Sequence, residues 1–193
     1  MSKITAPLSA QSWTRFAALG AIALVALYRI APHLPNVAPV GAMFVLGGLF
    51  LGRGVAWMAA PFAGLLISDT LLNLAYDGRP VHAERLVDYL AFALIALAAR
   101  WTAEKPAFAR IGVVVGAPVA FFLISNFGVW LAGGSLPGLP TYPHTLPGLA
   151  DCYAAALPFF RGTLFGDWLF AGVGFLALEG LKAREARGRM AVA

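Results

Sequence analysis

The sequence has one cysteine, three histidines and few charged residues. Lone Cys152 excludes an intramolecular disulfide and a cysteine-based zinc cluster. His33, His82 and His144 are scattered and show no metal-ligand spacing. The chain also lacks a nucleophile elbow and a phosphate-binding loop, so ATP hydrolysis by this chain is not expected. We therefore expect no cofactor, no bound metal and no enzymatic activity.

Charge is scarce throughout, since charged residues make up 12% of the chain and hydrophobic residues 60%. Soluble domains hold about 25% charged and about 45–50% apolar residues. This composition predicts an all-α integral membrane protein, with residues 1–193 forming a single membrane domain. The net charge of +5 does not indicate nucleic-acid binding, because the charges lie in short loops and tails rather than on one face.

Apolar runs predict a bundle of six transmembrane helices, most of them short. The second run would span only roughly 18 Å of the ~30 Å bilayer core, so we expect it to be a short helix buried against its neighbours. A long outer loop with four prolines, residues 133–157, separates the fifth and sixth helices, and its second half is expected to form a short interfacial helix. The predicted helices cover approximately residues 13–30, 40–51, 55–76, 86–99, 111–131 and 163–181.

The distribution of basic residues predicts the orientation in the cell membrane. With both termini in the cytoplasm, ten of the fourteen Lys and Arg residues lie inside and four lie outside. The inside residues are Lys3, Arg15, Arg53, Arg100, Lys105, Arg110, Lys182, Arg184, Arg187 and Arg189, and the outside residues are Arg29, Arg79, Arg85 and Arg161.

Asp69 is the most informative residue, because it lies inside the apolar run 55–76. An aspartate there costs about 2.5–3.5 kcal/mol on insertion scales, a cost that a partner or a ligand normally offsets. One interpretation makes Asp69 a ligand-binding residue. The other makes it structural, capping or cross-linking helices through Ser68, Asn73 or Asn126.

Nearly all polar residues within the predicted helices fall in the outer half of the membrane. A pore or proton relay would distribute them through the full thickness, so this pattern favours a pocket open to the outside. We expect Asp69, Asn126 and Asp167 to line it, closed by the segment 142–153. Acidic and aromatic groups without a matching intramembrane base favour a neutral or cationic, partly aromatic ligand. The candidate ligand-binding residues are Asn36, Asp69, Asn73, Asn126, Trp130, Tyr142, His144 and Asp167.

Three segments carry a resemblance to a known family. They are LPNVAPVGA at 34–42, GGLFLG at 47–52 and ISD at 67–69. With six short, glycine-rich helices, the chain resembles the substrate-binding (S) component of energy-coupling factor (ECF) transporters, as an uncharacterised branch. The resemblance implies a vitamin or micronutrient pocket near the outer face, and a membrane coupling subunit and two cytoplasmic ATPases as partners. It also implies that Ala17 and Ala21 form the face that docks on the coupling subunit.

Two other classes of protein remain open. The first is a structural or assembly membrane protein without a ligand, in which neighbouring helices fully satisfy Asp69 and Asp167. The second is an integral membrane enzyme that uses these two carboxylates as acid and base, with His144 as a further group. For a ligand-binding Asp69, Asp69→Asn should weaken binding and leave folding largely intact, whereas a structural Asp69 predicts poor expression.

Overall fold

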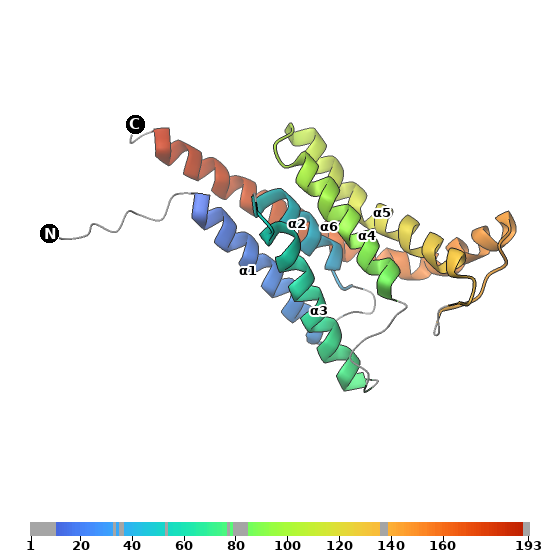
Figure 1. Cartoon of the computed structure of the whole chain (residues 1–193). Helices are drawn as coiled ribbons and strands as arrows, with labels where there is room; N and C mark the ends of the chain where they lie inside the picture. Colours follow the sequence, from blue (N-terminus) through green and yellow to red (C-terminus); the bar gives the residue numbers. More distant parts are fainter. Residues whose placement is uncertain are drawn as a thin grey trace.

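The computed structural model describes residues 11–32, 34, 37–52, 54–76, 78, 85–135 and 139–190, and within these ranges the regular structure is entirely helical. This confirms the predicted all-α class. Figure 1 shows these helices as an elongated bundle. They are α1 (Gln11–Ile30), α2 (Val40–Phe50), α3 (Ala56–Tyr76), α4 (Leu86–Thr102), α5 (Ala107–Ala132) and α6 (Leu146–Met190).

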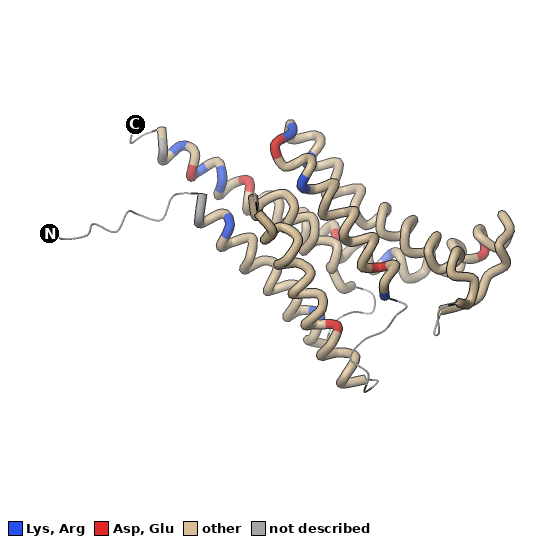
Figure 2. The backbone as a smooth tube through the Cα atoms, viewed as in Figure 1, with Lys and Arg blue, Asp and Glu red and all other residues tan. Residues whose placement is uncertain are grey.

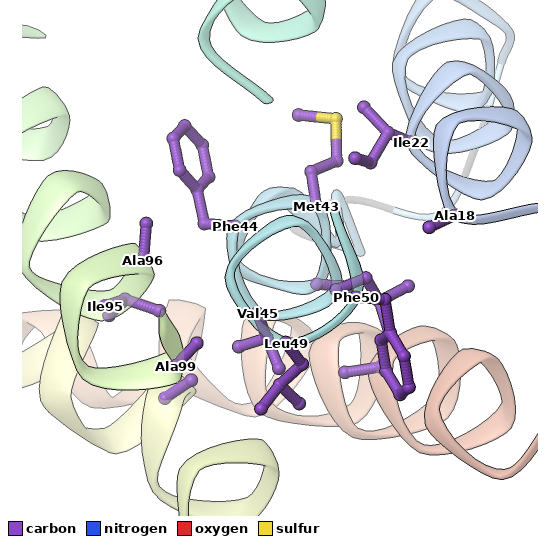
Figure 3. Packing of buried hydrophobic residues seen from close by; sticks show 14 of the residues in the cluster. Ala18, Ile22, Met43, Phe44, Val45, Leu49, Phe50, Ile95, Ala96 and Ala99 are labelled. Atoms are coloured by element: carbon purple, nitrogen blue, oxygen red, sulfur yellow. The ribbon is translucent and has the colours of Figure 1, made fainter. Parts of the chain in front are cut away.

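Helix α2 is the centre of the bundle. Every one of its eleven residues is buried, and it contacts each of the other five helices. Figure 3 shows its side chains pointing outward in several directions, toward α1, α4 and α6. Phe44 stacks on Phe92 of α4 at 5.0 Å and meets the ring of Phe62 of α3 edge-on at 4.9 Å. The predicted short, buried second helix is thus confirmed.

Two adjacent glycines allow neighbouring helices to approach the α2 backbone. A Cβ atom on Gly47 would lie 2.8 Å from the carbonyl oxygen of Trp57 in α3, and one on Gly48 would lie 2.7 Å from that of Ala96 in α4. Real Cβ atoms do not approach other atoms this closely, so both contacts require glycine. Small residues permit this backbone packing where helices associate in lipid.

The remaining helices are arranged around α2 in two groups. Helices α1 and α3 pack together on one side, α4 and α5 pack together on the other, and α6 contacts both α1 and α5 (Figure 1). The start of α1 and the end of α6 lie at the same end of the bundle. There, the backbone N–H and the hydroxyl of Thr14 both donate to the buried carboxylate of Glu185. We call this end of the bundle the terminal end.

Helix α6 differs most from the sequence-based expectation. It runs unbroken for 45 residues, whereas the sequence predicted a helix over 163–181 preceded by a loop to residue 157. Contacts with α5 hold its early part in place, including a hydrogen bond of 2.8 Å from the Tyr153 hydroxyl to the Leu123 carbonyl oxygen. Pro158 lies inside the helix, as transmembrane helices tolerate when neighbours satisfy the freed backbone. The connection between α5 and α6 is therefore limited to residues 133–145.

The exterior of the bundle is apolar over long stretches. Within the residues that the structure describes, four helices are long and apolar enough to cross a membrane: α1, α3, α5 and α6. Large hydrophobic side chains such as Leu24, Leu71 and Leu176 are exposed on them. Figure 2 shows long stretches of these helices without a charged residue. A water-exposed surface of this kind is not found on soluble monomers, so the helices have the character of an integral membrane protein.

Candidate ligand-binding site

A cavity of about 180 Å³ lies where the last turn of α1 and the first turns of α2 and α4 meet α3 and the middle of α5 and α6. All six helices therefore contribute to it. We call it the charged cavity. Its lining residues are Arg29, Ala38, Val40, Gly41, Leu65, Asp69, Arg85, Asp88, Tyr89, Phe92, Phe121, Thr163 and Asp167.

A buried ion pair between α1 and α3 forms one wall of the charged cavity. Arg29 Nη2 lies 2.6 Å from Asp69 Oδ1, and the two side chains are only 8% and 5% exposed. Both charges sit at the level of the apolar core, where either alone would be costly. The pair therefore explains how Asp69 is accommodated within an apolar helix.

Two hydroxyl groups complete the surroundings of this ion pair. Tyr89 of α4 donates to Asp69 Oδ2 at 2.8 Å, while Arg29 Nη1 donates to the hydroxyl of Ser68. Ser68, which is fully buried, donates in turn to the backbone carbonyl of Leu65 at 3.0 Å. Helices α1, α3 and α4 are thus connected through one polar network. Hydrogen bonds of this kind are what make a buried ion pair tolerable.

Asp167 of α6 interacts with the beginning of α2. Its Oδ1 accepts a hydrogen bond of 3.1 Å from the backbone N–H of Ala42, the third residue of that helix. The first N–H groups of a helix need acceptors, and the N-cap residue here, Pro39, has no side-chain acceptor. A carboxylate is also favoured by the positive end of the helix dipole. Asp167, only 2% exposed, therefore replaces the missing N-cap from another helix.

This arrangement depends on the absence of a side chain at Gly41. A Cβ atom there would lie 2.3 Å from Asp167 Oδ2 and 2.9 Å from its Cγ. Gly41 thus provides the space in which the carboxylate reaches the α2 amides. Part of the sequence segment 34–42 acquires a physical role here, since Ala38, Val40 and Gly41 line the charged cavity.

The rim of the charged cavity carries a second, more exposed pair of charges. Arg85 Nη1 lies 3.8 Å from Asp88 Oδ2, with side chains 44% and 28% exposed. Together the lining has three acidic and two basic side chains, and the rings of Tyr89, Phe92 and Phe121 supply aromatic surface. This mixture suits a small polar molecule that is neutral or carries a positive charge.

One donor in this wall has no acceptor. Among the described residues, Arg29 Nε is buried and makes no hydrogen bond, although both terminal nitrogens of the guanidinium are engaged. A buried donor left unpaired costs about 1–3 kcal/mol. Because Arg29 lines the charged cavity, an acceptor atom on a bound molecule can remove this cost.

The structure brings two of the predicted site residues together, Asp69 and Asp167. Asn126 does not line the charged cavity. Its Nδ2 donates a hydrogen bond to the backbone carbonyl oxygen of Phe122, one turn earlier in α5. Asn73, one turn beyond Asp69, and Tyr142 are half-buried and do not line it either. Asn36 lies outside the described residues.

Trp130 and His144 form a separate cluster where α5 meets the loop before α6. Trp130 Nε1 donates to the Pro143 carbonyl at 2.9 Å, and its ring lies 5.3 Å from that of exposed His144. His144 Nε2 also lies 3.0 Å from the Trp130 carbonyl oxygen. These contacts hold the loop on the end of α5. The sequence predicted that the segment 142–153 closes the charged cavity, but none of its residues lines that cavity.

Sequence reasoning missed the most important partner, Arg29. The sequence counts Arg29 among the outside basic residues, at the end of the predicted helix 13–30, and the ligand class rests on the lack of an intramembrane base. The buried Arg29 guanidinium corrects that argument. Its position in the last apolar turn of the first helix was a usable signal, since charges within membranes pair with one another. Tyr89 and Thr163 were also not among the candidates.

The fold and this site define a class of protein: an all-helical chain with membrane-spanning character and a charged cavity buried among its helices. Residues 10–188 match the family of unknown function DUF6580, and the chain belongs to this family. No curated protein and no solved structure matches the sequence.

Proposed function

We propose that this protein binds a small polar solute in the charged cavity, as the substrate-binding subunit of an uptake system of the ECF type. The observation that carries the proposal is the cavity itself, where charged groups from α1, α3, α4 and α6 converge and the Arg29 Nε donor finds no acceptor in the described part of the chain. At about 180 Å³ the space lies below the range of about 300–1,000 Å³ for drug-sized ligands. A small solute, neutral or cationic, is therefore the proposed ligand.

The outer face of α1 supports the proposed docking of a coupling subunit. Ala17 is exposed and Ala21 half-buried, and a Cβ atom on nearby Gly20 would meet nothing within 4 Å. These three small residues leave a short, shallow step on α1 between the exposed side chains of Trp13 and Leu24, and such a step lets another transmembrane helix approach closely. Two cytoplasmic ATPases would complete the transporter in this proposal.

Ligand binding is best tested at Thr163, because it lines the charged cavity and takes no part in the ion pair. Native mass spectrometry of gently purified protein is expected to show a bound small molecule in the wild type. Thr163→Phe should abolish it, since the phenyl ring fills the space. Leu169→Phe, at an exposed position of the same helix, is the matched control and should retain the molecule. Equal occupancy of both variants would contradict binding in the cavity.

The proposed orientation places both termini in the cytoplasm and the charged cavity on the outer side. In a Cys152→Ala background, which removes the lone thiol, Thr141→Cys and Glu104→Cys each add one exposed thiol. A membrane-impermeant maleimide on intact cells is expected to label position 141, and to label position 104 only after permeabilisation. The reason is the ten-to-four split of basic residues. The reverse labelling pattern would place the cavity on the cytoplasmic side.

A structural or assembly protein is the second candidate, and one observation favours it. Both aspartates have partners on other helices, Asp69 with Arg29 and Tyr89, and Asp167 with the Ala42 amide. The same pairing does not favour an enzyme that uses the two carboxylates as acid and base. A wild-type protein that carries no small molecule, yet loses stability on substitution of either aspartate, would support the structural candidate.

A further inference from the structure

The terminal end of the bundle contains a second cavity, larger than the first, of about 450 Å³. It lies where the start of α1, the end of α2, the end of α4 and the last part of α6 meet, and we call it the basic cavity. Figure 2 shows Lys and Arg concentrated near this end. The polar lining residues are Thr14, Arg15, Arg100, Glu104, Lys182 and Glu185.

Three cations from three helices converge on the basic cavity without an acidic partner. Arg15, Arg100 and Lys182 make no ion pair or hydrogen bond with any described residue. By contrast, Arg29, Arg85 and Arg110 each lie beside an acidic residue, Asp69, Asp88 and Glu179 respectively. Like charges that share a cavity repel one another, and a bound anion removes that repulsion.

The two acidic residues of the lining offset only part of this positive charge, and among the described residues neither forms an ion pair with the three cations. Glu185 is 8% exposed, and its two carboxylate oxygens accept hydrogen bonds of 3.0 and 2.8 Å from the amide and hydroxyl of Thr14. Its charge thus satisfies an N–H in the first turn of α1. Glu104 is the other acid of the lining, and it is exposed. The basic cavity therefore retains an excess of positive charge.

Arg15 is positioned by a glycine at the end of α2. Gly52 has a φ of +76°, and a Cβ atom on it would lie 2.7 Å from Arg15 Nη2 and 3.2 Å from Nε. The guanidinium therefore lies directly against the Gly52 backbone, in space that any other residue would fill. A planar guanidinium held in this way presents a fork of N–H donors suited to phosphate oxygens.

We propose that the basic cavity is a binding site for a phosphate group, with Arg15, Arg100 and Lys182 as its ligands. The phosphate comes either from an anionic phospholipid headgroup that enters between the helix ends or from a free phosphate compound. Basic pockets between transmembrane helices are a recognised setting for lipid headgroups. This site is independent of the charged cavity, and the proposal does not rest on solute uptake.

The test measures thermal unfolding of the full-length protein while a phosphate source is titrated. The sources are anionic phosphatidylglycerol, zwitterionic phosphatidylcholine as the comparison without net charge, and inorganic phosphate. Stabilisation by phosphatidylglycerol alone identifies a lipid headgroup, and stabilisation by inorganic phosphate identifies a free anion. Either result supports the site, and stabilisation by neither overturns it.

Matched variants separate a site from general charge attraction. Arg15→Gln/Arg100→Gln/Lys182→Gln is expected to weaken the apparent affinity about 100-fold, and Lys182→Gln alone about fivefold. Lys105→Gln/Arg184→Gln/Arg187→Gln removes the same charge outside the basic cavity and should change it by less than about threefold. The single Lys182 variant covers the case in which the triple variant does not fold. The proposal would be overturned if the two triple variants lost the same amount of affinity for the phosphate source, or if Lys182→Gln left that affinity unchanged.

Discussion

Asp69→Asn is expected to lower the free energy of unfolding by about 3–5 kcal/mol, the usual cost of removing one partner from a buried ion pair. The Arg29 guanidinium would remain in the core without a compensating charge, and the Tyr89 hydroxyl would lose an ionised acceptor. Thermal unfolding in detergent, beside the expression level, measures the effect. This replaces the sequence-based expectation that a ligand-binding Asp69 tolerates asparagine, because that expectation did not include Arg29.

A double-mutant cycle tests whether the loss arises from the unpaired charge. Arg29→Met/Asp69→Leu removes both charges and should recover most of the stability, since apolar residues often replace buried ion pairs at little cost. Asp88→Asn at the more exposed pair with Arg85 is the control, with an expected loss below about 1 kcal/mol. A double variant no more stable than Asp69→Asn would show that the hydrogen-bond network, not the charge balance, dominates.

Gly41→Ala is expected to destabilise the protein by about 2–4 kcal/mol, a large effect for one methyl group. The new Cβ would lie 2.3 Å from Asp167 Oδ2, so the carboxylate must move away from the Ala42 amide and leave a buried N–H unpaired. The same thermal unfolding assay measures the change. Asp167 is 2% exposed, so bulk solvent does not replace the lost hydrogen bond.

Two comparisons make the Gly41 result specific. Gly112→Ala in α5 adds the same methyl group where nothing lies within 4 Å, so stability should be unchanged or slightly higher because alanine is the better helix former. Gly41→Ala should also cost little in an Asp167→Ala background, where the clash is already removed. If the losses of stability from Gly41→Ala and Asp167→Ala simply add in the double variant, Gly41 acts independently of the carboxylate.

Some features of this protein follow from local sequence alone. Apolar runs gave the helical class and the approximate positions of α1 to α5, since a helix in lipid needs only a long enough apolar segment. The short run around Gly47 and Gly48 was correctly expected to be buried, because it is too short to cross a bilayer. Asp69 stood out as a residue that needs a partner for the same energetic reason.

The ends of helices were less predictable where charged or proline residues interrupt the pattern. Helix α6 begins at Leu146 because Tyr153 and its neighbours pack against α5, a contact that leaves no trace in the local sequence. Pro158 lies before the predicted start of the sixth helix at residue 163, although within a bundle the neighbouring helices can satisfy the backbone around it. Tertiary packing, not intrinsic propensity, decided this boundary.

The identity of the partners was decided only by the tertiary structure. Arg29 and Asp69 are 40 residues apart, and Ala42 and Asp167 are 125 residues apart, so no local pattern relates them. Each pair depends on which helices lie side by side and on their rotation about their own axes. The sequence by itself determined that buried charges exist and must be compensated. The arrangement of five helices around α2 determined that Arg29 compensates Asp69, that the α2 amides receive Asp167, and that a cavity remains between them.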